Sequence, residues 1–358
     1  MSLTTASATY LAALPKVELH VHLEGSIQPA TLLELARRNS VTLPVETEDE
    51  LQAWFQAVGP KNFFGVFSLL SSSLRRGEDF ERVAYEFGVD MARQNVRYAE
   101  VHFNAALHHM RGVEFDESFG GILRGREKAR RDFGVEMAWI LVVMRAPRLD
   151  HIVREHAADY AASTAIEAKN EGVVALGLGG EETDGDVAGF ARFFEPVRAA
   201  GLHVVPHAGE LGGAGNVTDA LDLLGAERIA HGVRSIERPE VVLRLADSKI
   251  CLDICPTSNI RLGIFRDMRS HPLGRLRDAG VPVSVSSDDP TPFGVDLNSE
   301  ICALENSLGL EGVEDVLMAA VRHAFLPPER RQSLEAELST EVRRLRGVHG
   351  LPAREAPL

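Results

Sequence analysis

The chain has 358 residues, of which 45% are hydrophobic, and a formal net charge of −14 at pH 7. This negative charge argues against nucleic acid and anionic membrane surfaces as partners, because both would repel it. Its three cysteines are too few for a disulfide scaffold, and no apolar run reaches the roughly 18 residues of a membrane helix, so we expect a cytoplasmic protein.

Short β-branched or apolar runs alternate with helix-length segments along the chain, which is typical of a parallel sheet with crossover helices. Eight runs of this kind predict strands at residues 17–23, 97–103, 137–144, 173–178, 203–207, 228–231, 250–254 and 281–286. Eight strands favour a (β/α)8 TIM barrel over an open doubly wound sheet, which usually has a glycine-rich phosphate turn after its first strand. We therefore expect an α/β barrel that forms a single domain over residues 1–358.

Two segments are additional to the eight strands and connecting helices of a basic barrel. Residues 29–95 are longer than one crossover helix and contain Asn-Phe-Phe-Gly-Val-Phe, which predicts a helical insertion after the first strand, serving as a lid over one barrel end. Within it, Phe63 and Phe67 lie one helical turn apart and could equally line a site or pack in a core. Extra C-terminal helices follow the eighth strand, the last of them with the tail at residues 327–358.

Histidine and aspartate side chains gather at the predicted strands and their ends. They are His20 and His22 in the first strand, His207 and His231 at the ends of the fifth and sixth, and Asp288 and Asp289 after the eighth. Alternate residues of a strand share a face, and barrel active sites form at the carboxyl ends of the strands, so these groups should meet. One His-x-His pair or one Asp before proline would be unremarkable, but their convergence on one rim favours a functional site.

Three imidazoles and one carboxylate suit a single zinc ion with an open position for water. The ligands that we expect are His20, His22, His207 and Asp288, giving one Zn²⁺ per chain. A second metal is disfavoured because the fourth strand ends in glycines, which offer no side-chain ligand. Bound zinc lowers the pKa of its water to about 7, which supplies a nucleophile at neutral pH.

Two further side chains gain roles once a metal is placed. Glu210 follows His207 by three residues and is close enough to give or take a proton, although it could also be a carboxylate at a helix N-terminus. His231 could be a metal ligand, or it could orient the hydroxide and stabilise developing charge. The residues themselves leave both alternatives open.

Five motifs in this order resemble the adenosine deaminase family of the amidohydrolase superfamily. They are Lys-Val-Glu-Leu-His-Val-His-Leu-Glu-Gly at 16–25, His-Ala-Gly-Glu at 207–210, His-Gly at 231–232, Cys-Pro-Thr-Ser-Asn at 255–259 and Ser-Asp-Asp-Pro at 287–290. The resemblance spans nearly the whole chain.

The resemblance implies a catalytic set in which Asp288 joins Glu210, the proton donor to purine N1, and His231, which positions the hydroxide. It further implies that Asp289 meets N7 of the ring and that Gly180 meets N3. Attack at C6 would then release ammonia. The activity implied is zinc-dependent hydrolytic deamination of a 6-aminopurine nucleoside, with a small-molecule aminopurine as the partner.

Two positions depart from the adenosine-specific members of this family. Glu24 stands where those members carry an aspartate that contacts the ribose, and Gly-Leu-Gly-Gly at 177–180 replaces Asp-Leu-Ala-Gly. We expect substrate contacts from Glu24, Gly180, Asp289, Phe63 and Phe67. The substrate is expected to be adenosine or a sugar-modified analogue such as 6-aminodeoxyfutalosine. Free adenine is the alternative substrate, and a catalytically silent binding protein of the same fold is the alternative of another class.

Overall fold

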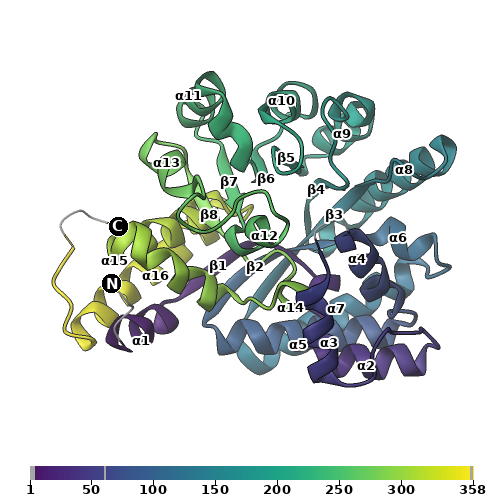
Figure 1. The fold of residues 1–358 in the computed structure, drawn as a ribbon, viewed down its shortest axis with the longest axis horizontal. Coiled ribbons are helices and arrows are strands. Elements are labelled where there is room, and N and C mark those ends of the chain that lie inside the picture. The colour runs from purple at the N-terminus through teal and green to yellow at the C-terminus, as the bar shows by residue number, and fades with distance from the viewer. Residues whose placement is uncertain (1–4, 60–61, 355–357) are drawn as a thin grey trace.

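Eight parallel strands form the centre of the molecule in the computed structural model, which describes residues 5–59, 62–354 and 358. The strands are β1 (Lys16–His22), β2 (Val96–Phe103), β3 (Glu136–Arg145), β4 (Val173–Gly180), β5 (His203–Ala208), β6 (Arg228–His231), β7 (Cys251–Ile254) and β8 (Val283–Val285). They pair in chain order, with helices around them (Figure 1). The predicted (β/α)8 TIM barrel is confirmed, and every strand end lies within two residues of its expected position.

The barrel closes between β1 and β8 through a side chain as well as the backbone. The hydroxyl of Ser286 accepts hydrogen bonds from the backbone N–H groups of Leu19 and His20, at 3.2 and 3.1 Å. Beyond the short strand β8, Asp288 pairs with Val21 in an isolated parallel bridge. This closure brings the chain after β8 against the strand that carries the His-x-His motif.

A buried ionic cluster fills the interior of the barrel beneath its carboxyl end. Arg228 of β6 contacts Glu100 of β2 at 2.7 Å and Asp253 of β7 at 2.8 Å, and its guanidinium stacks over the ring of Phe325. All three charged groups are fully buried, so each depends on the others to offset the cost of losing water. We call this buried cluster the floor of the barrel.

Helices connect the strands and cover the barrel (Figure 1). Between β1 and β2 lie η1 (Glu24–Ser26), α2 (Pro29–Arg38), α3 (Glu48–Ala57), α4 (Phe63–Ser72) and α5 (Gly77–Arg93). The later connections contain α6 (Ala105–His109), α7 (Phe115–Phe133), α8 (His151–Glu167), η3 (Ala168–Glu171), η4 (Val187–Phe190), α9 (Ala191–Ala199), α10 (Ala214–Asp219), η5 (Ala220–Leu224), η6 (Val233–Glu237), α11 (Pro239–Asp247), α12 (Pro256–Arg261), α13 (Leu273–Asp278) and α14 (Pro290–Phe293).

Local chemistry explains where the helices of the segment after β1 begin. Pro29 starts α2, where its missing N–H would have no partner in any case. Thr47 caps α3 by accepting a hydrogen bond from the backbone of Glu50, whose side chain bonds back to Thr47. Residues 60–61 of the predicted 29–95 insertion lie outside the described residues, as do 1–4 and 355–357 at the chain ends.

Three helices pack together on one side of the barrel (Figure 1). They are α1 (Thr5–Ala13), α15 (Leu297–His323) and α16 (Pro328–Val348). The sequence predicted the last two but not α1. Gly309, at φ 66°, interrupts α15 with a conformation that glycine adopts readily. No helix within the described ranges has the length and apolar character that crossing a lipid bilayer requires.

Candidate active site

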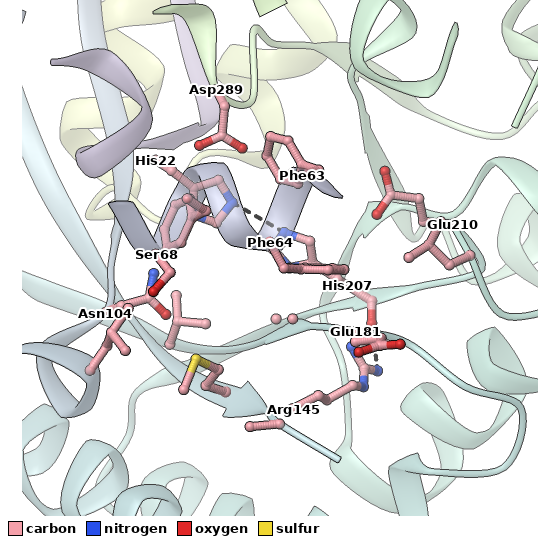
Figure 2. Close-up of a pocket in the computed structure, with 18 of the residues that line it drawn as sticks. His22, Phe63, Phe64, Ser68, Asn104, Arg145, Glu181, His207, Glu210 and Asp289 are labelled. Atoms are coloured by element: carbon pink, nitrogen blue, oxygen red, sulfur yellow. Dashed lines mark hydrogen bonds between the residues drawn. The ribbon is translucent and has the colours of Figure 1, made fainter. Parts of the chain in front are cut away.

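A cavity of about 390 Å³ opens at the carboxyl ends of the strands (Figure 2). Its polar wall includes His22, His207, Glu210, His231, Asp288 and Asp289. Much of the remaining lining is apolar and includes Phe63, Phe64, Phe67, Leu107, Met110, Met144 and Leu149. An apolar cavity with a few convergent polar groups is the usual form of a small-molecule site.

Four side chains converge at the base of the polar wall. The Nε2 atom of His207 lies 3.1 Å from Nε2 of His20 and 3.3 Å from Nε2 of His22. Asp288 Oδ1 lies 3.4 Å from both of the latter nitrogens. Ligand atoms around a tetrahedral zinc ion are about 3.3 Å apart, given zinc–nitrogen bonds of about 2.0–2.1 Å. These four distances are close to that spacing.

Two contacts orient these ligands. His20 Nδ1 lies 3.3 Å from the backbone oxygen of Asp253, to which it can donate, and this leaves the Nε2 lone pair facing the cluster. Because the side chain of Asp253 is bound by Arg228, the floor of the barrel fixes that carbonyl group. On Asp288, the second carboxylate oxygen accepts a hydrogen bond of 2.6 Å from Ser258.

The backbone also holds Asp288 in place. Its N–H donates to the carbonyl of His20 at 3.1 Å, and its carbonyl accepts from the N–H of His22 at 2.8 Å. The residue sits at φ 64°, a left-handed conformation that is uncommon outside glycine and often found at functional sites. The backbone of Asp288 is therefore fixed beside β1, opposite Val21 of the His-x-His motif.

Two of the three imidazoles in the cluster have the protonation state of a metal ligand, whereas the pKa of His20 is raised because the hydrogen bond and charge of Asp288 outweigh its burial. Burial lowers the pKa of His22 to about 4 and holds the pKa of His207 well below its usual value. Burial alone would raise the pKa of Asp288, but the hydrogen bond and charge of His20 outweigh it and lower that pKa. Neutral imidazoles beside an ionised carboxylate are the forms in which these residues bind metal.

Glu210 and His231 lie beside this cluster. His231 Nε2 is 3.4 Å from Glu210 Oε1 and 3.9 Å from Asp288 Oδ2, and together with His20, His207 and Asp288 it forms a group that could hold a metal ion. Burial, with added repulsion from Asp288 and Glu182, raises the pKa of Glu210 well above its usual value. Burial lowers the pKa of His231 to about 3. Glu210 can thus carry a proton beside a neutral imidazole.

Asp289 and Gly180 both line the cavity, as expected for substrate contacts. Burial, together with the charge of Asp288, raises the pKa of Asp289 well above its usual value, and Oδ1 has no hydrogen-bond partner among the described residues. Gly25 leaves room for this carboxyl group, because a Cβ atom there would overlap it. Gly180, at φ 94°, packs its Cα against the backbone of Arg145 where no side chain would fit.

Glu24 is not among the residues that line the cavity. Its Oε1 accepts hydrogen bonds from the backbone of Asn104 at 3.0 Å and lies 3.1 Å from Nε2 of His108. The side chain is fully buried. In this conformation Glu24 supports Asn104, which does line the cavity, and a direct contact between Glu24 and substrate stays a prediction.

Phe63 and Phe67 project from α4 into the cavity. The ring of Phe67 meets the imidazole of His22 edge-on, with 5.8 Å between ring centres, and Phe63 stacks on Phe293 at 4.8 Å. Val66 and Leu70 form the buried core-facing side of the same helix. The two phenylalanines are therefore cavity-lining residues.

Sequence reasoning missed several polar groups around the site. Glu182 accepts hydrogen bonds from the backbone N–H groups of Gly209, Glu210 and Gly212, at 2.7 to 3.0 Å, so it shapes the turn that presents Glu210. His102 is fully buried 4.8 Å from the ring of His20, and neither of its nitrogens has a partner in the described part of the chain. The sequence signals available were that His102 lies within one predicted strand and that Glu182 follows shortly after another.

Comparison with known proteins agrees with this geometry. The family model described as adenosine deaminase matches residues 15–341. An adenine deaminase from Cupriavidus necator is 36% identical over 340 residues, which cover 94% of this chain and 95% of that protein. An aminodeoxyfutalosine deaminase from Acidothermus cellulolyticus is 37% identical over 308 residues, or 84% of each chain.

A crystal structure of an amidohydrolase from Burkholderia ambifaria, with bound Zn, superposes with a TM-score of 0.87 at 26% identity. The superposition covers 98% of this chain and 96% of that one. The relationship thus extends over the whole barrel, and the predicted resemblance is confirmed. The chain belongs to the adenosine deaminase family of the amidohydrolase superfamily and is an aminohydrolase.

Proposed function

We propose that this aminohydrolase replaces the 6-amino group of an aminopurine with oxygen from water. The observation that carries the proposal is the convergence of a metal-ligand cluster, the protonated Glu210 and the carboxyl group of Asp289 on one cavity wall. The metal-ligand cluster can hold a hydrolytic metal, and Glu210 and Asp289 can donate hydrogen bonds to ring nitrogens. A catalytically silent binding protein would not need this set intact.

The metal that we propose is a single Zn²⁺, held by His20, His22, His207 and Asp288. When bound, zinc supplies a water molecule with a pKa lowered to about 7 and polarises the reacting centre. The spacing of the four ligand atoms and the neutral state of His22 and His207 support this choice.

The protein's own groups would then divide the remaining work. Glu210 gives its proton to ring N1, which makes C6 more electrophilic. Asp289 donates to N7 through its own proton, and the backbone of Gly180 meets N3 at the far edge of the ring. Because these groups lie at or after the ends of three different strands of the barrel, a purine held by all of them has one orientation.

Cavity size favours a nucleoside over a free base. At about 390 Å³ the cavity exceeds a purine ring, and the extra space is lined by apolar groups such as Phe67, Met144 and Leu149. We propose a 6-aminopurine nucleoside as the substrate, either adenosine or a sugar-modified analogue such as 6-aminodeoxyfutalosine. The helix α4 would act as a lid over its sugar end.

Free adenine is the second candidate, and Glu24 is the observation that favours it. The carboxylate at the predicted sugar-contact position is engaged by Asn104 and His108, so it is not presented to a ribose. One of the similar proteins is an adenine deaminase and another an aminodeoxyfutalosine deaminase. These two activities are the ones to compare.

A substrate panel tests the proposal. Zinc-loaded protein is assayed for ammonia release from adenosine, deoxyadenosine, adenine, methylthioadenosine and aminodeoxyfutalosine. A nucleoside with the highest kcat/KM supports the proposal, whereas preference for adenine shifts it to the free base. Absence of turnover with all five compounds overturns it.

The three cysteines are free thiols, which suits the cytoplasmic, single-domain enzyme that we propose.

A further inference from the structure

A chain of hydrogen bonds connects the start of α13 to the catalytic wall. At its far end, the backbone N–H of Leu273 donates to Nδ1 of His271 at 3.3 Å. A backbone N–H can only donate, so Nδ1 must be the accepting nitrogen of this imidazole. Burial lowers the pKa of His271 to about 4, which keeps the ring neutral. The single ring proton of His271 therefore lies on Nε2.

The next member of the chain is Asn259, which is fully buried on α12. His271 Nε2 lies 3.3 Å from its side-chain oxygen and donates to it. This contact fixes which way the amide faces, because the oxygen must point to His271 and the Nδ2 hydrogens must point away. Both hydrogens are used, toward Glu210 Oε1 at 3.1 Å and His231 Nδ1 at 3.2 Å.

The last of these hydrogen bonds determines which ring nitrogen of His231 carries the proton. Because Nδ1 accepts from Asn259, the proton of the neutral ring lies on Nε2, the nitrogen that faces Glu210 and Asp288. In that tautomer Nε2 has no lone pair to offer a metal. This tautomer suits the second of the two roles that the sequence left open for His231, a hydrogen-bond donor at the site.

We propose that Asn259 and His271 are positioning residues: together they hold His231 as the Nε2–H tautomer and orient Glu210 toward the substrate. The catalytic consequence rests on the proposed function. The tautomer itself is a property of the protein without substrate, so it can be measured even if the substrate assignment fails.

The direct test is nitrogen NMR of the zinc-loaded full chain carrying ¹⁵N-labelled histidine, with the His231 signals identified by their loss in His231→Gln. We expect Nδ1 of His231 to be unprotonated and Nε2 to be protonated. Asn259→Asp keeps the shape of the side chain but replaces the donor with an acceptor, so the proton should move to Nδ1. A protonated Nδ1 in the unchanged protein, or an unmoved proton in Asn259→Asp, overturns the proposal.

Kinetics provide the second arm, using the substrate that the panel identifies. Asn259→Asp should lower kcat by about 10² to 10⁴-fold, as expected for a catalytic histidine in the wrong tautomer, with little change in KM. Asn259→Leu, which brings no buried charge, should also lower kcat with bound zinc retained. A drop in KM and kcat that tracks loss of zinc would indicate a purely structural role and overturn the proposal.

A matched pair at His271 separates hydrogen bonding from packing. His271→Phe keeps the ring that contacts Phe265 but removes the donor, and it should lower kcat. His271→Gln retains an N–H for Asn259 and should recover most of that loss. Equal kcat values in the two variants would contradict a role through Asn259.

Discussion

The two sides of the cavity are built by different means. On the metal side, each ligand sits on or directly after a barrel strand, and Asp288 is hydrogen-bonded through its backbone to both His20 and His22. On the apolar side, Phe63 and Phe67 are half-buried on one short helix in the segment between β1 and β2. The barrel thus fixes the position of the reacting groups, while an added segment shapes the space for the rest of the substrate. We infer that reaction type and substrate choice can change separately in this fold.

Removal of the metal should have the largest effect on activity and stability, because the metal joins the side chains on the metal side of the cavity. Chelation should abolish turnover and lower the free energy of unfolding by several kcal/mol, since zinc binds only the folded cluster. The melting temperature and the zinc content report this directly. His207→Ala serves as the control, because it should show little response to the chelator. Full activity of protein proven to be metal-free would contradict the assignment.

Loss of the proton donor should come next. Glu210→Gln keeps the size of the side chain and a partner for Asn259, but it cannot transfer a proton, so kcat should fall by about 10² to 10⁴-fold. Bound zinc, measured by elemental analysis, should remain at the level of the unchanged protein. Comparable activity in this variant would remove Glu210 from the mechanism.

A smaller effect concerns pH and stability at His271. Its pKa is about 4 in the folded protein against 6.5 for an ordinary histidine. The unfolded chain therefore binds more protons between these values, and stability is lost as the pH falls from about 6.5 to about 4, by up to about 3 kcal/mol. Denaturant unfolding across this range should show a shallower loss in His271→Gln. Parallel curves for the two proteins would show that the ring is not held neutral.

The smallest effect is expected on the apolar side. Phe67→Ala should raise KM for a nucleoside by about tenfold, because a buried aromatic contact is worth about 1–2 kcal/mol in such a pocket. KM for adenine should change much less, since the base lies at the polar wall. Phe133→Ala, a partly exposed position away from the cavity, is the control. An equal rise in KM for base and nucleoside would place Phe67 against the purine instead.

Residues placed by strand ends could be predicted from the sequence, whereas residues whose role depends on contacts with distant parts of the chain could not. Parallel strands end at one edge, so placing His207 at the end of a predicted strand was enough to bring it near His20. Glu182 could not be predicted, because its importance comes from binding backbone groups 27 to 30 residues farther along the chain. Asn259 was visible as part of a motif, but its role depends on the distant ring of His271. The orientation of Glu24 was hidden for the same reason, since His108 lies on α6.

We propose that this site uses water to replace the amino group of a purine, with Glu210 as the proton donor. Mass spectrometry of the reaction in oxygen-18 water tests it most directly, with zinc-loaded protein and the best substrate of the panel. We expect a 6-oxopurine product that carries the heavy oxygen, ammonia in equal amount, and almost no product from Glu210→Gln with zinc in place. Product without the label, or undiminished product from that variant, would contradict it.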